Sequence, residues 1–212
     1  MTEDTKLTIM VSSSVYGIEE LLDRIYTLLT AFGYEVWMSH RGTVPVFSSR
    51  SAFDNCMAAT DKCDLFLGLI TPQYGSGKEP GGLSITHREL LRAIEQNKPR
   101  WLLAHDHVVF ARTLLNQLGY AGKEGRAKLS LKRSATLDDL RVIDMYEDAI
   151  LSQTPLADRQ GNWVQKFRSD DDAALFAAAQ FSRYQEVEAF VRENFRDSAH
   201  VSQSIQEAGG RS

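Results

Sequence analysis

The amino-acid sequence predicts an α/β fold in which helices cover both faces of a doubly wound parallel sheet of about five strands. Apolar runs of strand length alternate with segments of helical periodicity up to about residue 119. The run from Leu65 to Ile70 is apolar at nearly every position, which is typical of a strand buried on both faces. Polar or glycine-rich segments follow the strands, at the edge where folds of this class bind ligands.

The expected elements can be placed in chain order. Strands are expected at residues 7–11, 34–38, 65–70 and 100–104, with a fifth, edge strand at 128–132. Helices are expected at 18–32, at 53–59, from Ser84 or Thr86 to just before Pro99, at 108–118, at 136–151, and from Asp170–Asp172 to Phe195. We therefore expect an α/β domain at 1–133, a helical extension packed on it at 134–195, and a disordered tail at 196–212.

Composition limits the classes of function. The chain has 212 residues, of which 43% are hydrophobic, so there is ample material for a core. Its net charge of -4 gives no reason to expect nucleic acid or an anionic membrane as a partner. The two cysteines, Cys56 and Cys63, fit neither a zinc site nor a disulfide framework. Without a signal peptide pattern or a membrane-spanning run, we expect a soluble cytoplasmic protein.

Three serines, Ser12, Ser13 and Ser14, follow the first strand and precede the first helix. Hydroxyl groups and free N–H groups at a helix start form an anion site, so this turn can hold a phosphate or a ribose hydroxyl. Serine is also a preferred helix N-cap, and one of the three is expected to cap the helix. Both interpretations are open at the level of the sequence.

Glu89 is the leading candidate for a catalytic side chain. It lies near the start of the helix that follows the strand at 65–70, where a carboxylate can face the crevice beyond the sheet. The same spacing fits a capping box formed by Thr86 and Glu89, in which the carboxylate only accepts a hydrogen bond from a backbone N–H. The sequence leaves both roles open.

The loop before this helix contains Tyr74 and several glycines, among them Gly75. The tyrosine can stack on a nucleobase, or it can anchor the loop by packing. The glycine-rich segment from Gly75 to Gly82 can close over a substrate, or it can be a disordered connection.

A polar triplet, His105-Asp106-His107, ends the strand at 100–104. In an extended chain the two histidines point to one face and Asp106 to the other. Two imidazoles and a carboxylate are metal ligand types, but no further His or Cys stands at a recognisable spacing. A polar strand end is therefore the favoured interpretation, and no metal site is expected.

Three segments carry a family resemblance: IMVSSSVYGIEELLDRIY, CDLFLGLITPQYGSG and LSITHRELLRAIEQNKPRWLL. Together they resemble a domain of unknown function that has an ISST-type start and an S-x-T-x-x-E helix, and the match covers about residues 6–105. That domain is similar to Toll/interleukin-1 receptor (TIR) domains and to nucleoside 2-deoxyribosyltransferases, which share a flavodoxin-like sheet. Both relatives use a glutamate on the helix after a central strand to cleave or transfer an N-glycosidic bond.

The resemblance implies a catalytic role for Glu89 and a nucleotide pocket beside it. The substrate-binding candidates are Ser12, Ser13, Ser14, Tyr16, Tyr74, Gly75, Ser84 and Thr86. The implied activity is hydrolysis or transfer at the N-glycosidic bond of NAD or a related nucleotide, in a bacterial defence effector. No cofactor is expected, because the nucleotide is itself the substrate or ligand.

Two other classes of function are open. One is a non-catalytic module that binds a nucleotide signal and passes it to a separate partner protein, since family members often precede a large NTPase or repeat region. The other is a TIR-like self-association domain, which would form a homo-oligomer. Base release that depends on Glu89 separates the enzyme from the binding module, and a concentration-dependent size identifies the assembly domain.

Overall fold

The structure, a computed structural model, describes residues 6–77, 82–132, 134, 136–183 and 186–187. Its centre is one five-stranded sheet with the strand order β2-β1-β3-β4-β5, in which every neighbouring pair is parallel. The strands are β1 (Thr8–Ser13), β2 (Glu35–Met38), β3 (Leu65–Ile70), β4 (Arg100–His105) and β5 (Val164–Phe167). This order is that of a flavodoxin-like fold, so the predicted fold class is confirmed.

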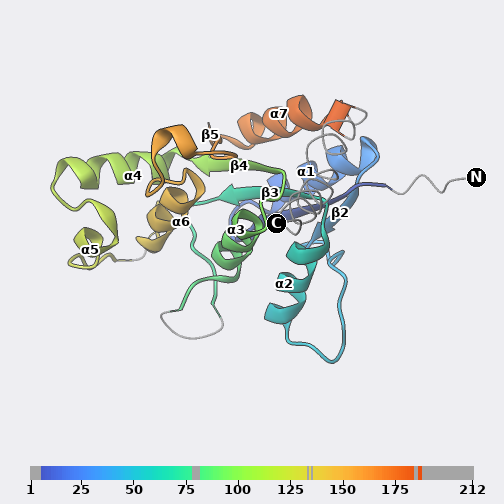
Figure 1. Ribbon diagram of the computed structural model, residues 1–212, viewed down its shortest axis with the longest axis horizontal. Helices are drawn as coiled ribbons and strands as arrows, with labels where there is room; N and C mark the ends of the chain where they lie inside the picture. The colour runs from blue at the N-terminus through green and yellow to red at the C-terminus, as the bar shows by residue number, and fades with distance from the viewer. Residues whose placement is uncertain (1–5, 78–81, 133, 135, 184–185, 188–212) are drawn as a thin grey trace, which may run out of the picture.

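Helices lie on both faces of the sheet (Figure 1). The helix α1 (Glu19–Ala31) lies beside α7 (Asp170–Phe181) on one face. The other face carries α2 (Ala52–Lys62), α3 (Ile85–Glu95) and α6 (Arg141–Ala149). Beyond the end of β4 the chain continues through α4 (Asp106–Gln117) and α5 (Gly122–Arg126), and a short 3₁₀ helix, η1 (Leu156–Asp158), precedes β5.

Two hydrophobic cores result, one on each face. All six residues of β3 are buried, as expected for the centre of a sheet covered on both sides. On the α1 and α7 face, Phe181 packs edge-on against Tyr34 and tilted against Trp101. On the opposite face, Leu90 and Ala93 of α3 share a core with residues of α2 and α6.

The fifth strand was assigned to the wrong residues. Residues 128–132 form no strand, and Leu131 is exposed. The strand beside β4 is β5, in which Val164 pairs with Leu102. The Lys-Leu-Ser-Leu-Lys alternation predicts a strand locally, but a strand also needs a free sheet edge, and only the chain that returns after α6 reaches that edge.

Other element boundaries also differ from the prediction. Residues 136–151 contain the shorter helix α6, and the five-residue helix α5 was not predicted. The capping box that starts α7, between Ser169 and Asp172, agrees with the helix start expected near Asp170. The continuation of this helix toward Phe195 and the expected tail at 196–212 lie outside the described residues, and the domain boundary at residue 133 stays a prediction.

No helix in the described part of the chain is long and apolar enough to cross a membrane.

Candidate functional site

The site is centred on a contact between Ser12 and Glu89. The Ser12 hydroxyl donates a hydrogen bond of 2.5 Å to Glu89 Oε2, although the two residues are 77 positions apart. Ser12 lies near the carboxyl end of β1, and Glu89 lies on the inner side of α3 with 5% of its surface exposed. Because β1 and β3 are the strands between which the connections change direction, this is the place where open α/β sheets bind ligands.

A third residue, Cys56 of α2, completes this cluster. Its thiol hydrogen-bonds to the Glu89 carboxyl group. Burial, together with the nearby Glu89 carboxyl, raises the pKa of Cys56 to about 12, so the thiol stays protonated and remains a donor. Three segments, β1, α2 and α3, therefore converge on one carboxyl group.

The pKa of Glu89 is raised above its ordinary value because the side chain is removed from water. The hydrogen bonds from Ser12 and Cys56 favour the ionised form and offset only part of that effect. A carboxyl group with this environment holds its proton more readily than an exposed glutamate does. It can therefore act in proton transfer when a substrate or water reaches it.

The capping-box interpretation of Glu89 is wrong. The N-cap of α3 is Ser84, whose hydroxyl accepts the backbone N–H of His87 at 3.2 Å. Glu89 consequently lies five residues after the N-cap, too far along the helix to accept from its first N–H groups. Thr86 is buried in the first turn and does not cap the helix. The carboxyl group thus has no structural role at the helix start.

The serine turn does not cap α1 either. The N-cap position is Ile18, and no side chain in the described part of the chain accepts a capping hydrogen bond there. The reason is that β1 extends through Ser13, and a loop containing Gly17 at φ 81° separates the serines from the helix. Ser13 donates locally to the Ser14 carbonyl at 2.9 Å. Tyr16 in this loop is 70% exposed.

Ser14 joins the ends of β1 and β3. Its hydroxyl lies 2.6 Å from Thr71 Oγ1 and donates to the Gln73 carbonyl at 2.7 Å. Gly75 has φ 79°, and a Cβ built on it would lie 3.5 Å from Ser14 Cβ. The two predicted residues Ser14 and Gly75 are therefore neighbours, and their contacts hold the loop after β3 against the serine turn.

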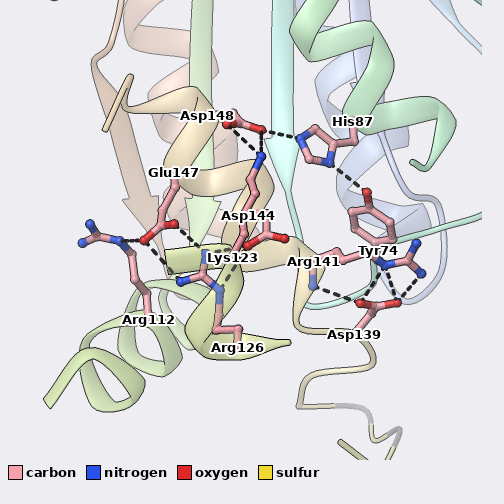
Figure 2. A network of polar contacts seen from close by, with 10 residues as sticks. All are labelled: Tyr74, His87, Arg112, Lys123, Arg126, Asp139, Arg141, Asp144, Glu147 and Asp148. Carbon is pink, nitrogen blue, oxygen red and sulfur yellow. Dashed lines mark hydrogen bonds and ion pairs between the residues drawn. The ribbon is translucent and has the colours of Figure 1, made fainter. Parts of the chain in front are cut away.

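Tyr74 is engaged in a buried network and does not stack above the crevice (Figure 2). Its hydroxyl lies 2.8 Å from His87 Nδ1, and His87 Nε2 lies 2.9 Å from Asp148 Oδ2. The Arg141 guanidinium lies over the Tyr74 ring at 4.5 Å from its centroid. The loop-anchoring interpretation of Tyr74 therefore agrees with the structure.

The histidine and aspartate triplet is arranged differently from the prediction. β4 ends at His105, and Asp106 and His107 already belong to the first turn of α4. The chain is therefore not extended across the triplet, and Asp106 does not point away from the histidines. The Asp106 Oδ1 atom lies 3.1 Å from His105 Nδ1 and 4.0 Å from His107 Nε2.

Cavities open elsewhere on the described surface, and two of them lie near the helices α2, α3, α5 and α6. One of about 500 Å³ lies between α2 and α3 and is lined by Phe53, Leu91 and Arg92 among others. Another of about 340 Å³ is lined by residues of α5 and α6 and by the segment between them. The lining of neither cavity includes Ser12 or Glu89.

Several residues of the site were not predicted. Cys56 belongs to a helix whose inner side also buries Asn55 and Thr60, and small polar residues on a buried face are a usable signal. His87 and Asp148 gave no comparable signal, because they are 61 residues apart and meet only where α6 packs near α3.

Comparison with known proteins places the chain in a family. No curated protein matches this sequence. The profile of a domain of unknown function, DUF4062, matches residues 8–207, so the chain belongs to that family.

Proposed function

We propose that this protein cleaves or transfers the N-glycosidic bond of a nucleotide of the NAD type, and that Glu89 is the catalytic carboxyl group. The observation that carries the proposal is the buried Glu89 carboxyl at the carboxyl edge of the sheet, held by Ser12 at 2.5 Å. The resemblance to TIR domains and deoxyribosyltransferases supports it, because those domains place a catalytic glutamate on the equivalent helix. A role as a bacterial defence effector is proposed on that resemblance alone.

The chemistry follows from the bond that breaks. Departure of the base leaves positive charge on the ribose, as in glycoside hydrolysis. An ionised carboxylate beside the ribose stabilises that charge or attacks the ribose carbon, and the same group in its protonated form can donate to a leaving base. The hydrogen bonds from Ser12 and Cys56 hold the Glu89 carboxyl group in place for the reaction.

A non-catalytic nucleotide-binding module is the second candidate. It is favoured by the burial of Glu89, which is 5% exposed and surrounded by Ser12 and Cys56. In this arrangement a ligand at the sheet edge would contact the serine turn first. Such a module would bind the nucleotide and leave it intact.

The experiment is incubation of the purified protein with NAD, NADP and a panel of nucleosides and nucleotides, with free base followed by chromatography. Glu89→Gln keeps the shape of the side chain and should lower base release by at least about 100-fold, the usual contribution of an acid or base group. The matched control is Glu95→Gln on the same helix, whose side chain is 68% exposed and paired with Arg92.

The outcomes separate the two candidates. Base release by the wild type and by Glu95→Gln, but not by Glu89→Gln, supports the enzyme. If base release is absent while a nucleotide raises the melting temperature of the wild-type protein, the binding module replaces it. Release that is equal in all three proteins would rule out Glu89 as the catalytic group.

A further inference from the structure

We propose that His105, Asp106 and His107 form a binding site for a divalent transition-metal ion. In the described part of the chain these residues form a group in which each offers one ligand atom, and all three atoms lie within 4.8 Å of one another. The rings of the two histidines are 4.5 Å apart between centroids. The proposal is independent of the glycosidic chemistry at Glu89.

The strand-to-helix transition brings the three side chains together. His105 is the last residue of β4 and the N-cap of α4, and the chain enters the helix at Asp106. In an extended strand Asp106 would point away from the two histidines. Because the chain turns into a helix at Asp106, its carboxylate instead lies close to both histidine rings. The His105 ring is further fixed by edge-on packing against Phe167 of β5, with the ring centroids 5.2 Å apart.

Asp106 Oδ1 is the atom that points to a cation. This oxygen atom is buried, and no hydrogen-bond donor of the described residues reaches it. Its neighbour at 3.1 Å is His105 Nδ1, whose lone pair accepts the backbone N–H of His107 at 3.2 Å. Since Nδ1 then carries no proton, two electron-pair donors face each other, and a cation between them would satisfy both.

Binding the ion would break few existing interactions of these residues. Coordination through His105 Nδ1 would release the His107 N–H, which is one of the N–H groups at a helix start that have no intrahelical partner and can bind water. The His107 side chain is 48% exposed and that of Asp106 39% exposed, so an ion can enter from solvent. Asp170, the first residue of α7, is close enough to act electrostatically on His105 and adds negative charge.

The ligand set selects the class of metal. Two imidazole nitrogens with one carboxylate suit Zn²⁺, Co²⁺, Ni²⁺ or Cu²⁺, whereas Mg²⁺ and Ca²⁺ prefer oxygen ligands alone. At Zn–N distances of about 2.0–2.1 Å, tetrahedral ligand atoms lie roughly 3.3 Å apart. The 3.1 Å and 4.0 Å separations around Asp106 Oδ1 need only a small rotation of the exposed His107 ring to match.

The test uses untagged full-length protein, freed of metal with a chelator and titrated with Zn²⁺ by calorimetry and with Co²⁺ by visible absorption. We expect one equivalent of ion to bind, with d–d bands from the Co²⁺ complex. His107→Ala and Asp106→Asn should each weaken binding more than roughly tenfold, since the first removes a ligand atom and the second replaces an anionic carboxylate ligand by a neutral amide. The control, His40→Ala, removes a different histidine that is paired with Asp23 at 3.0 Å and should leave binding unchanged.

Circular dichroism and thermal melting of each metal-free variant establish that it is folded. A Zn²⁺-dependent rise in melting temperature in the wild type and in His40→Ala, absent from His107→Ala, supports the site independently of calorimetry. The proposal is overturned if neither ion binds below about 100 µM, an affinity near 5–6 kcal/mol. It is also overturned if the triplet variants bind as tightly as the wild type.

Discussion

Two buried glutamates of this protein have opposite electrostatic environments. Burial raises the pKa of Glu89, and among the described residues only the neutral donors Ser12 and Cys56 act against it. Burial acts on Glu147 in the same direction, but hydrogen bonds and charge from Arg126 and Arg112 outweigh it, and the pKa of Glu147 is lowered. A glutamate kept apart from cations is a group available for chemistry, whereas one held by two guanidiniums is structural.

We predict that Glu89→Gln raises stability at neutral pH by roughly 0.5–2 kcal/mol, the range of a single stabilising substitution, because it removes a buried group whose ionised form is disfavoured. Since the pKa of Glu89 is higher folded than unfolded, the folded state loses stability as the pH rises above the ordinary value of 4.5 toward the folded pKa. Gln does not ionise, so the variant avoids this loss. Thermal melts at several pH values should show the gain shrinking to zero toward about pH 4.

The control for this experiment is Glu95→Gln, which removes an exposed carboxylate from the same helix. It should show no such gain at neutral pH. A Glu89→Gln protein that is less stable than the wild type at neutral pH would contradict the assigned environment of Glu89.

At the scale of elements, a cluster of charges holds α5 against α6. Arg126, the last residue of α5, is buried and contacts Asp144 and Glu147 of α6. Arg112 of α4 reaches Glu147 from the other side at 3.0 Å (Figure 2). One turn of α6 therefore connects two preceding helices, which explains how a helix as short as α5 keeps its place.

We predict that Arg126→Met lowers the free energy of unfolding by about 3 kcal/mol, because it leaves Glu147 buried with one cation fewer. For a chain of this length that corresponds to a fall in melting temperature of about 6–12 °C. Differential scanning calorimetry measures the change. Arg92→Met, which removes a surface arginine paired with Asp61 and Glu95, should produce a much smaller shift. Equal shifts for the two variants would show that the α5 contact is not stabilising.

At the scale of the whole molecule, Asp148 connects three segments that are distant in sequence. Its carboxylate contacts His87 of α3 and Lys123 of α5, while Asp148 itself belongs to α6. Burial by itself would raise the pKa of Asp148, but the contacts with His87 and Lys123 lower it overall. This group therefore links the packing of the helices to pH.

We predict that acid weakens the protein partly through Asp148. Because its folded pKa is below the ordinary value of 3.8, its contribution is complete above that value and is lost as the pH falls through the folded pKa. Asp148→Asn should therefore be less stable than the wild type at neutral pH, by about 1–3 kcal/mol for loss of a charged hydrogen bond. Urea unfolding at neutral and acidic pH checks this, and a difference that persists undiminished at low pH would contradict it.

Local sequence patterns determined the fold class and the positions of most strands and helices. The predicted strand at 65–70 coincides with β3, because a run of apolar residues bounded by Asp64 and Pro72 is readable without any partner. The helix with Glu89 was also recognisable, because its Ser84 cap and its apolar periodicity are local properties, and the three adjacent serines after the first strand are visible in the sequence itself. For this reason the fold class and the two central residues of the candidate site, Ser12 and Glu89, could be predicted.

Only the tertiary structure decided what these residues contact. Glu89 fits a capping box by spacing, but the packing of α3 against β1 and α2 gives its carboxyl group to Ser12 and Cys56. Residues 128–132 alternate like a strand, yet the free edge of β4 pairs with residues 164–167. Contacts between distant segments depend on which surfaces pack together in the folded chain. Local sequence patterns give the helix or strand propensity of each segment, but they do not specify which segments pack against each other.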